Sequence, residues 1–266
     1  MIAAALHMAG IGAAAVIGLM FLLWLIHFAI RNAAIVDVGW AGGLGLLAIL
    51  YAGLGRAYAP RGILIAAMGG IWGLRLALHL LLTRVIGQPE EGRYVQLRQE
   101  WRTNVPMKFL LFYEFQAVLC VVMSAPFLLP ALNAAPQLSI GEFTGPVVWL
   151  IGIIGEAAAD AQLKAWKARP ESRGKTCRNG LWKYSRHPNY FFEWLIWMGF
   201  AIFALGSPYG YVGLISPALI LYFLLRVTGI PATEAQALRT RGDDYREYQR
   251  TTSAFVPWFP REGKPA

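Results

Sequence analysis

The stretch Gly180-Leu-Trp-Lys-Tyr-Ser-Arg-His-Pro-Asn-Tyr-Phe-Phe-Glu193 joins a polar, basic segment directly to an apolar one. Pro188 has no backbone N–H and a φ angle suited to the first turn of a helix, so it predicts a helix start. The residue before a proline is restricted to extended conformations, so His187 should end the preceding loop. The apolar residues that follow place this helix start where water meets a membrane.

The composition of the whole chain indicates an integral membrane protein. Its 266 residues are 57% hydrophobic, 13% aromatic and 15% charged, with a mean hydropathy of +0.47, which leaves too little polar surface for a soluble globule. A membrane crossing needs about 20 apolar residues. Such runs occur at 9–30, 34–54, 62–82, 107–132, 145–166, 190–205 and 209–227. We expect an all-α fold of about seven transmembrane helices in a single domain over residues 1–266.

The net charge of +9 follows the loops. Basic residues gather near 84–108, near 167–189 and in the tail 228–266, whereas 133–144 and 206–208 contain no Lys or Arg. By the positive-inside rule, we expect the N-terminus to face out and the C-terminus to face the cytoplasm. Topology and anionic lipid can account for this charge, so nucleic acid is not an expected partner.

Motifs for several other sites are missing from the sequence. Cys120 lies in an apolar run and Cys177 in a basic loop, and there is no Cys-x-x-Cys or His-x-x-x-His spacing, so neither a disulfide nor a metal is expected. No Gly-x-Gly-x-x-Gly follows a strand, which excludes a Rossmann domain. The first apolar run has no basic residue before it and is too long for a signal peptide, so it should be a retained helix.

Prolines and glycines set the remaining boundaries. Pro89 should open a short interfacial helix in the first basic loop. The last apolar run is predicted to end near Gly229-Ile-Pro231, and a water-exposed amphipathic helix should follow from Thr233 to Gln249. Gly242 should break that helix.

Seven ionisable residues lie within or near the apolar runs. Each costs about 3 kcal/mol at the centre of a lipid-exposed helix unless it faces a cavity or a partner. A structural ion pair, such as Asp37 with Arg75, would explain any one of them but not easily the whole set. We therefore expect several to line one polar cavity. They are Asp37, Arg75, His79, Glu114, Glu156, Asp160 and Glu193.

Asp160, Lys164 and Lys167 follow i, i+4 and i+7 spacing and share one helix face. A carboxylate there suits a ribose hydroxyl, and ammonium groups suit phosphates. The alternative is an ordinary solvated helix end. The next loop adds polar and basic groups that favour a pyrophosphate, and NADPH over NADH, as the cofactor. They are Arg173, Lys175, Arg178, Tyr184, Arg186 and His187.

Asn189 and Glu193, four residues apart, project from one face of the predicted first turn. An amide offers a donor and an acceptor together, which matches the carboxamide of a nicotinamide, and Glu193 can orient it. A His-Pro pair at a helix start is by itself usually only a cap. The complete string Gly-Leu-x-x-Tyr-Ser-Arg-His-Pro-Asn-Tyr-x-x-Glu is much more specific.

This string resembles the C-terminal signature of the steroid 5-alpha-reductase superfamily of membrane enzymes, and the chain is similar to the bacterial branch of that superfamily over most of its length. The tail from Gly242 to Pro260 is similar to the closing motif of the family. The resemblance implies seven helices around NADPH and a lipophilic substrate, a steroid or another lipid, whose conjugated C=C bond is reduced. It implies cofactor contacts from Asp160, Lys167, Tyr184, Asn189, Glu193, Arg226, Tyr245 and Arg246. The complete predicted cofactor site adds Arg75, His79, Lys164, Arg178, Arg186, His187 and Glu234.

Steroid reductases use an acid on helix two and a tyrosine on helix three to polarise the substrate carbonyl. Asp37 matches the acid, but Trp72 stands where the tyrosine is expected, and an indole is a poor proton donor. Glu114 and Gln116 are other candidates. Hydride attack at the β-carbon of an enone leaves negative charge on the carbonyl oxygen, so a protonated acid there lowers the barrier. We expect burial to keep Asp37 protonated for this role, while the nicotinamide supplies the hydride.

A membrane methyltransferase that uses S-adenosylmethionine is the alternative. Isoprenylcysteine carboxyl methyltransferases and phospholipid methyltransferases also carry Arg-His-Pro-x-Tyr before a late helix. Asn189 with Glu193 favours the reductases, whereas a Glu-Glu pair in the last cytoplasmic helix would favour the methyltransferases, and only Glu234 is present there. A non-enzymatic lipid-binding or scaffold protein would leave the polar signature unexplained. No obligate protein partner is evident.

Overall fold

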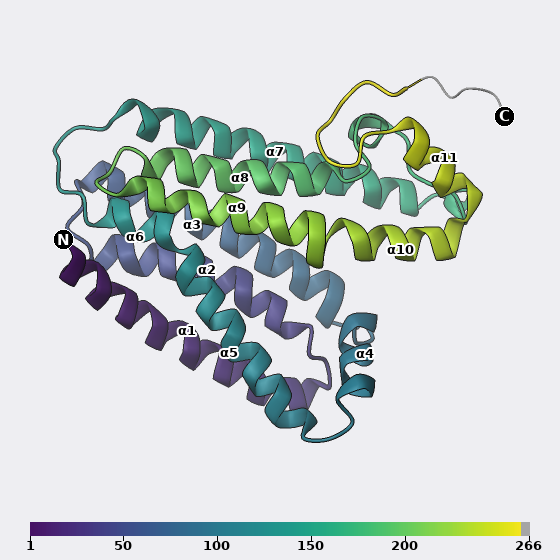
Figure 1. The fold of residues 1–266 in the computed structure, drawn as a ribbon, viewed down its shortest axis with the longest axis horizontal. Helices are drawn as coiled ribbons and strands as arrows, with labels where there is room; N and C mark the ends of the chain where they lie inside the picture. The colour runs from purple at the N-terminus through teal and green to yellow at the C-terminus, as the bar shows by residue number, and fades with distance from the viewer. Residues whose placement is uncertain (262–266) are drawn as a thin grey trace. The chain divides into compact units, whose positions relative to one another are not determined.

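The structure, a computed structural model, describes residues 1–261, and that part of the chain is all-α with no β-strand. In chain order the elements are α1 (Ile2–Ile30), α2 (Ile35–Leu54), α3 (Ala59–Leu80), η1 (Leu81–Val85), α4 (Gly92–Trp101), α5 (Val105–Met123), α6 (Ala125–Ala131), α7 (Ile140–Lys167), η2 (Pro170–Ser172), η3 (Gly180–Lys183), α8 (Pro188–Ala204), η4 (Gly210–Leu214), α9 (Ile215–Tyr222), η5 (Phe223–Val227), α10 (Ile230–Arg241) and α11 (Asp243–Thr251) (Figure 1).

Within the described part of the chain, six helical segments are long and apolar enough to cross a membrane, so the chain is a multi-pass membrane protein. They are Ile2–Ile30, Ile35–Leu54, Ala59–Val85, Val105–Met123, Ile140–Lys167 and Gly210–Arg241. The predicted run 190–205 is not among these six; it coincides with α8, which is apolar but has only 17 residues. At 1.5 Å per residue it is about 26 Å long, slightly shorter than a hydrocarbon core of roughly 30 Å.

Two predicted boundaries are confirmed and two are wrong. Pro188 begins α8, and Gly242, with φ at 53°, separates α10 from α11. The run 107–132 is not one helix, because the chain breaks at Ser124, two residues before Pro126, which has no N–H for the helical ladder. The interfacial helix α4 begins at Gly92 and not at Pro89.

The chain divides into two compact units. The first unit consists of Met1–Phe143 with Ala201–Ser216, and the second consists of Thr144–Phe200 with the chain from Pro217 onward.

In the first unit, α2 and α3 approach closely because small residues face one another. A Cβ atom on Gly73 would lie only 2.7 Å from Gly45 Cα and 2.9 Å from the Ala41 oxygen. Small residues let the backbones of membrane helices approach in this way. Gly73 and Gly45 are therefore required by the packing of α2 against α3, whether or not a ligand binds nearby.

A buried arginine connects three parts of the first unit. Arg61, near the start of α3, donates to the Glu142 carboxylate at the start of α7, and both side chains are almost fully buried. Its guanidinium also donates to the backbone oxygens of Asn133, Ala135 and Gln137 at 2.6, 2.9 and 2.8 Å. Arg61 therefore holds the segment between α6 and α7 against the first turn of α3.

In the second unit, α7 and α8 pack through another set of small residues. A Cβ atom on Gly199 would lie 2.6 Å from the Trp149 nitrogen, and one on Gly152 would lie 2.9 Å from the Ile196 nitrogen. The short helices α10 and α11 enclose a small core of their own, made by Ala237, Tyr245 and Tyr248.

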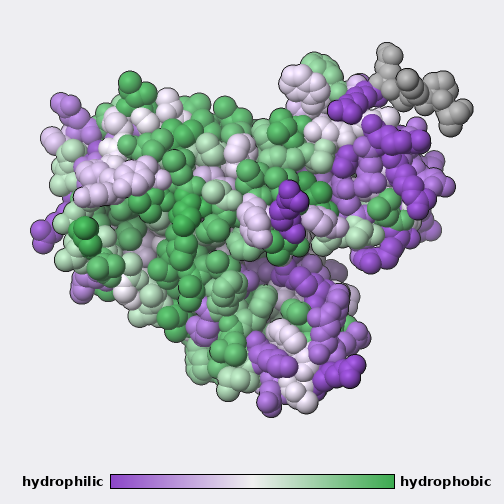
Figure 2. Space-filling model, viewed as in Figure 1, coloured by the Kyte–Doolittle hydropathy of each residue, from purple (hydrophilic) through white to green (hydrophobic). Residues whose placement is uncertain are grey.

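The surface separates apolar helices from polar ends. In Figure 2 hydrophobic residues cover the long helices, whereas hydrophilic residues gather over α4 and, separately, over α10 and α11. These hydrophilic areas correspond to the basic loop near 84–108 and to the basic tail of the sequence.

Candidate functional site

The signature segment meets the C-terminal helices at Glu234. Arg186 Nε donates to Glu234 Oε1 at 2.7 Å, and His187 Nε2 lies 3.2 Å from the same oxygen. Tyr245 Oη donates to this oxygen at 3.4 Å, and Gln249 Nε2 donates to the other carboxylate oxygen at 2.6 Å. We call these five residues the Glu234 cluster. Four of them were predicted from the sequence, and Gln249 was not.

Burial makes the Glu234 cluster a preorganised polar site. The side chains of Arg186, His187 and Glu234 are only 10%, 3% and 14% exposed. Burial, and after it the Glu234 carboxylate, raises the pKa of Tyr245, so its phenol stays protonated and donates. The buried positive and negative groups satisfy one another, as the cost of burying a charge requires.

The loop before α8 holds His187 in position. Its backbone N–H donates to Ser185 Oγ at 3.1 Å, and its ring stacks on Tyr190 with the ring centres 5.3 Å apart. Pro188 then starts the helix, as the sequence predicts. The imidazole is therefore held by its own chain on one side and by Glu234 on the other.

One turn further along, α7 and α8 bring together two of the predicted cofactor residues. Asn189 Nδ2 donates to Asp160 Oδ1 at 3.3 Å, so the amide orientation is set by a carboxylate from the neighbouring helix. Glu193 Oε1, four residues beyond Asn189, accepts a hydrogen bond from Trp197 Nε1 at 2.9 Å.

A basic pocket opens near the end of α7. Its volume is about 230 Å³, and three cations and two hydroxyl groups stand among its lining residues. The lining residues are Leu163, Trp166, Lys167, Ser172, Gly174, Lys175, Cys177, Thr240 and Arg241. Sequence reasoning named Lys167 and Lys175 but missed Arg241, because Arg241 comes from a helix more than sixty residues further along the chain. Burial raises the pKa of the Cys177 thiol, which is therefore a neutral wall of the pocket.

Other predicted cofactor residues of the second unit lie outside this pocket. Arg178 Nη2 pairs with Asp244 at 3.2 Å and with Glu247 at 3.3 Å, so it ties its loop to α11. Arg246 is exposed and pairs with Asp243 at 2.6 Å. Both arginines are accounted for by bonds to α11 residues.

The remaining predicted residues of the cofactor site occupy separate places. Lys164 is exposed on α7, and Arg226 is exposed in η5. The ring of Tyr184 contacts Phe259 of the tail, with ring centres 6.0 Å apart. Arg75 and His79 belong to α3 of the first unit, with His79 exposed, and neither is part of the Glu234 cluster or the basic pocket.

In the first unit, Asp37 makes three side-chain contacts. It accepts hydrogen bonds from Arg84 at 3.2 Å, Arg93 at 3.1 Å and Tyr94 at 2.8 Å. We call these four residues the Asp37 cluster. The ion pair with Arg75, considered from the sequence, is replaced by pairs with Arg84 and Arg93. Arg84, Arg93 and the Tyr94 hydroxyl together hold the Asp37 carboxylate in one orientation.

Tyr94 is the residue of the Asp37 cluster that sequence reasoning missed. It is fully buried on α4, and its ring meets Phe112 edge to face at 6.2 Å. Burial, and next the Asp37 carboxylate, raises the pKa of Tyr94 well above its ordinary value. The phenol of Tyr94 is therefore a neutral hydrogen-bond donor. It lies on α4, in the basic loop that follows α3, whereas the sequence suggested Trp72 of α3 as the donor.

The other two predicted catalytic residues lie within apolar helices. Trp72 is fully buried on α3, with its ring 5.9 Å from that of Trp40. Glu114 on α5 has one buried carboxylate oxygen without a hydrogen-bond partner among the described residues.

The start of α4 is set by Glu90. Its carboxylate accepts from the backbone N–H of Ala33 at 2.8 Å and from Arg98 Nε at 2.8 Å. Burial opposes ionisation, but the hydrogen bonds from Arg98 and the Ala33 N–H, together with the positive charge of Arg98, outweigh it and lower the pKa of Glu90. Because these bonds tie the chain before Gly92 to the start of α2, α4 begins three residues later than Pro89.

Known proteins resemble this chain over very different lengths. The sequence profile of a family described as "Protein of unknown function (DUF1295)" matches residues 23–252. A probable O-methyltransferase of Ustilaginoidea virens, ustE, is 33% identical over 92 residues, a match that covers 32% of this chain and 32% of that protein. The match thus spans about a third of that relative's length. No solved structure matches the chain.

Proposed function

The chain belongs to the DUF1295 family, and we propose that it is an NADPH-dependent membrane reductase, similar to the steroid 5-alpha-reductases, that reduces the conjugated C=C bond of a lipophilic enone. The observation that carries this proposal is the basic pocket at the end of α7. Lys167, Lys175 and Arg241 surround one cavity there, together with the hydroxyl groups of Ser172 and Thr240.

This donor set fits a phosphate-rich ligand. Ammonium and guanidinium groups form strong charge-assisted hydrogen bonds with phosphate oxygens, and hydroxyl groups can complete the set. NADPH carries a pyrophosphate and a further phosphate, whereas S-adenosylmethionine carries no phosphate and has a positive sulfonium. A positive pocket therefore favours NADPH on electrostatic grounds.

The residues near the start of α8 suit the nicotinamide end. The Asn189 amide, oriented by Asp160 at 3.3 Å, offers both a donor and an acceptor to a carboxamide. NADPH, when bound, supplies the hydride. The Glu234 cluster would hold this segment rigid, so that Asn189 keeps one orientation.

The enone gains a hydride at its β-carbon and a proton at its α-carbon, so its double bond becomes single while its carbonyl is retained. Negative charge develops on the carbonyl oxygen during this reaction, and a neutral donor lowers the barrier. We assign that role to Tyr94: its hydroxyl accepts from Arg93 and donates its single proton to Asp37, and this proton would turn to the carbonyl oxygen when the substrate binds. Asp37 is then a positioning residue and not the acid itself.

Tyr94→Phe should reduce turnover by about 10²–10⁴-fold, the usual size of a lost acid–base contribution, with NADPH affinity unchanged. Single-turnover reduction of a lipophilic enone measures this effect. Asp37→Asn provides the comparison, because an asparagine can still accept from Tyr94, so its effect should be smaller. Normal turnover in Tyr94→Phe would remove this tyrosine from the mechanism and return attention to Glu114.

The proposal includes a membrane topology. We infer that α8 crosses the membrane as a seventh span, slightly thinning the bilayer to match its 17 residues. An odd number of spans puts the two termini on opposite sides, and the positive-inside rule then places the basic loops and the tail in the cytoplasm of a bacterial inner membrane.

A methyltransferase is the second candidate, because one relative is named a probable O-methyltransferase. In this alternative the Glu234 cluster would serve a donor that carries positive charge, and S-adenosylmethionine would be that donor. The carboxylate of Glu234 is compatible with this, but it is already paired with Arg186.

Titration of the purified protein with NADPH and with S-adenosylmethionine separates the two functions. We expect saturable binding of NADPH, weakened roughly tenfold to a hundredfold in Lys167→Gln and in Lys175→Gln, since a hydrogen bond to a charged group contributes about 1.5–3 kcal/mol. Lys164→Gln, an exposed lysine of the same helix outside the pocket, is the matched control and should bind normally. Binding of S-adenosylmethionine alone would overturn the proposal.

A further inference from the structure

The C-terminal tail is fastened to the loop that precedes α8. The backbone N–H of Arg186 donates to the Ser253 oxygen at 2.8 Å, and the backbone N–H of Trp258 donates to the Tyr184 oxygen at 2.9 Å. Ser185 Oγ donates to the Phe255 oxygen at 2.8 Å. These bonds run along the tail, so the position of its side chains relative to α8 is fixed.

The tail also contacts the apolar part of α8. The ring of Phe255 lies 5.7 Å from that of Phe191 and 6.0 Å from that of Trp194. Trp194 is six residues beyond the helix start at Pro188, which corresponds to about 9 Å along the axis. If α8 crosses the membrane as proposed above, with the basic loop at the membrane surface, this depth would correspond to the boundary between lipid headgroups and acyl chains.

Three further side chains of the tail are apolar and exposed. Val256, Trp258 and Phe259 are 53%, 69% and 75% exposed. Aromatic residues of this kind are enriched at membrane interfaces, where a flat ring sits among the headgroups. Their exposure is therefore consistent with contact to lipid.

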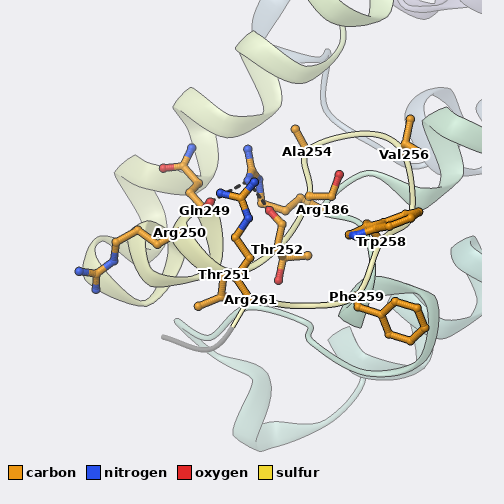
Figure 3. Close-up of a pocket in the computed structure, with 11 residues that line it drawn as sticks. Arg186, Gln249, Arg250, Thr251, Thr252, Ala254, Val256, Trp258, Phe259 and Arg261 are labelled. Atoms are coloured by element: carbon orange, nitrogen blue, oxygen red, sulfur yellow. Dashed lines mark hydrogen bonds between the residues drawn. The ribbon is translucent and has the colours of Figure 1, made fainter. Parts of the chain in front are cut away.

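A pocket lies under the same segment, and Figure 3 shows its lining. Its volume is about 450 Å³. We call it the tail pocket, and its lining residues are Arg186, Gln249, Arg250, Thr251, Thr252, Ser253, Ala254, Val256, Trp258, Phe259 and Arg261. It shares no lining residue with the basic pocket.

The tail pocket combines positive charge with an apolar rim. Arg186 is held in its wall by hydrogen bonds to the backbone oxygens of Gln249 and Thr252 at 3.0 and 2.6 Å. The exposed Arg261 is placed beside it by a bond from its backbone N–H to the Thr251 oxygen at 2.8 Å. In Figure 3 the side chain of Arg261 extends toward Arg186, whereas that of Arg250 points away.

We propose that the tail pocket binds an anionic phospholipid, with the headgroup phosphate beside Arg186 and Arg261 and the acyl chains along Trp258 and Phe259. Basic pockets at the membrane surface attract anionic headgroups, and the exposed rings supply the apolar contact that a soluble phosphate does not need. The two proposals share Arg186 and Gln249, which also belong to the Glu234 cluster, so the variants that test this site are made at Arg261 and the apolar rim.

Thermal melting of the full-length protein in detergent tests this site, because a ligand that binds only the folded state raises the melting temperature. Phosphatidylglycerol should stabilise the protein at lower concentrations than phosphatidylcholine of the same chain length. Arg261→Gln should weaken the phosphatidylglycerol effect roughly fivefold, since one basic residue near a membrane surface contributes about 1 kcal/mol. Trp258→Ala with Phe259→Ala should weaken binding of the same lipid independently of charge.

Arg246→Gln is the matched control, because it removes the same charge from an exposed arginine outside the tail pocket. It should respond to phosphatidylglycerol as the wild type does. Equal stabilisation by the two lipids would overturn the proposal. A second result would also overturn it: stabilisation of the wild type, but not of Arg261→Gln, by inorganic phosphate or by NADPH. The pocket would then bind a soluble anion and not a lipid.

Discussion

Replacing Arg61 with methionine is expected to lower the free energy of unfolding by about 3–5 kcal/mol, the usual cost of removing one partner from a buried ion pair. The Glu142 carboxylate would remain buried without a counter-charge, and the oxygens of Asn133, Ala135 and Gln137 would lose their donor. In a thermal melt, a loss of this size corresponds to a decrease of roughly 10 °C.

The double variant Arg61→Met with Glu142→Met is the informative comparison. Replacing both members of a buried pair by apolar residues is often close to neutral, so the double variant should melt nearer to the wild type than Arg61→Met does. The exposed pair of Arg246 with Asp243 provides a surface reference, and Arg246→Gln should not change the melting temperature. If Arg61→Met melted like the wild type, the buried pair would have no structural role.

Glu234→Ala is the second substitution for which we expect a large effect. It would leave Arg186 and His187, 10% and 3% exposed, without their shared acceptor, and should destabilise the protein by about 3 kcal/mol. Because the same residues hold the chain before α8, NADPH affinity should fall as well. Thermal melting and cofactor titration of the purified variant measure the two effects.

Two comparisons make the Glu234 result specific. Glu234→Gln keeps an oxygen that can accept from Arg186 and should lose less stability than the alanine variant. The Glu247 side chain, which pairs with Arg178, is 55% exposed. Glu247→Ala should therefore behave like the wild type, because surface ion pairs contribute little to stability. Wild-type stability together with wild-type NADPH affinity in Glu234→Ala would contradict the importance of the cluster.

Local signals in the sequence were sufficient for much of the fold. Apolar runs identified a multi-pass all-α protein, Pro188 marked the start of α8, and Gly242 marked the break before α11. The predicted run 107–132 divides at Ser124. The sequence analysis did not consider that Pro126, two residues further on, lacks the N–H that a continuous helix needs. The span count differs at α8, where 17 residues lie at the limit of what a length criterion can decide.

The sequence also located one part of the candidate site. Arg186, His187 and Asn189 lie in a short segment with a specific pattern, and the structure places all three in buried or partly buried contacts. The cofactor and the reaction stay predictions, because the contacts among these residues do not by themselves identify a ligand.

By itself, the sequence determined where helices begin, which of them are apolar and where positive charge accumulates, because these properties depend on neighbouring residues. Only the tertiary structure decided the partners of the charged groups. Asp37 pairs with Arg84 and Arg93 and not with Arg75, and Arg241 joins Lys167 across more than seventy residues of chain. The physical reason is that the strength of an ion pair or a hydrogen bond depends on the distance between its atoms in space. Spacing along the chain determines that distance only for residues of the same helix.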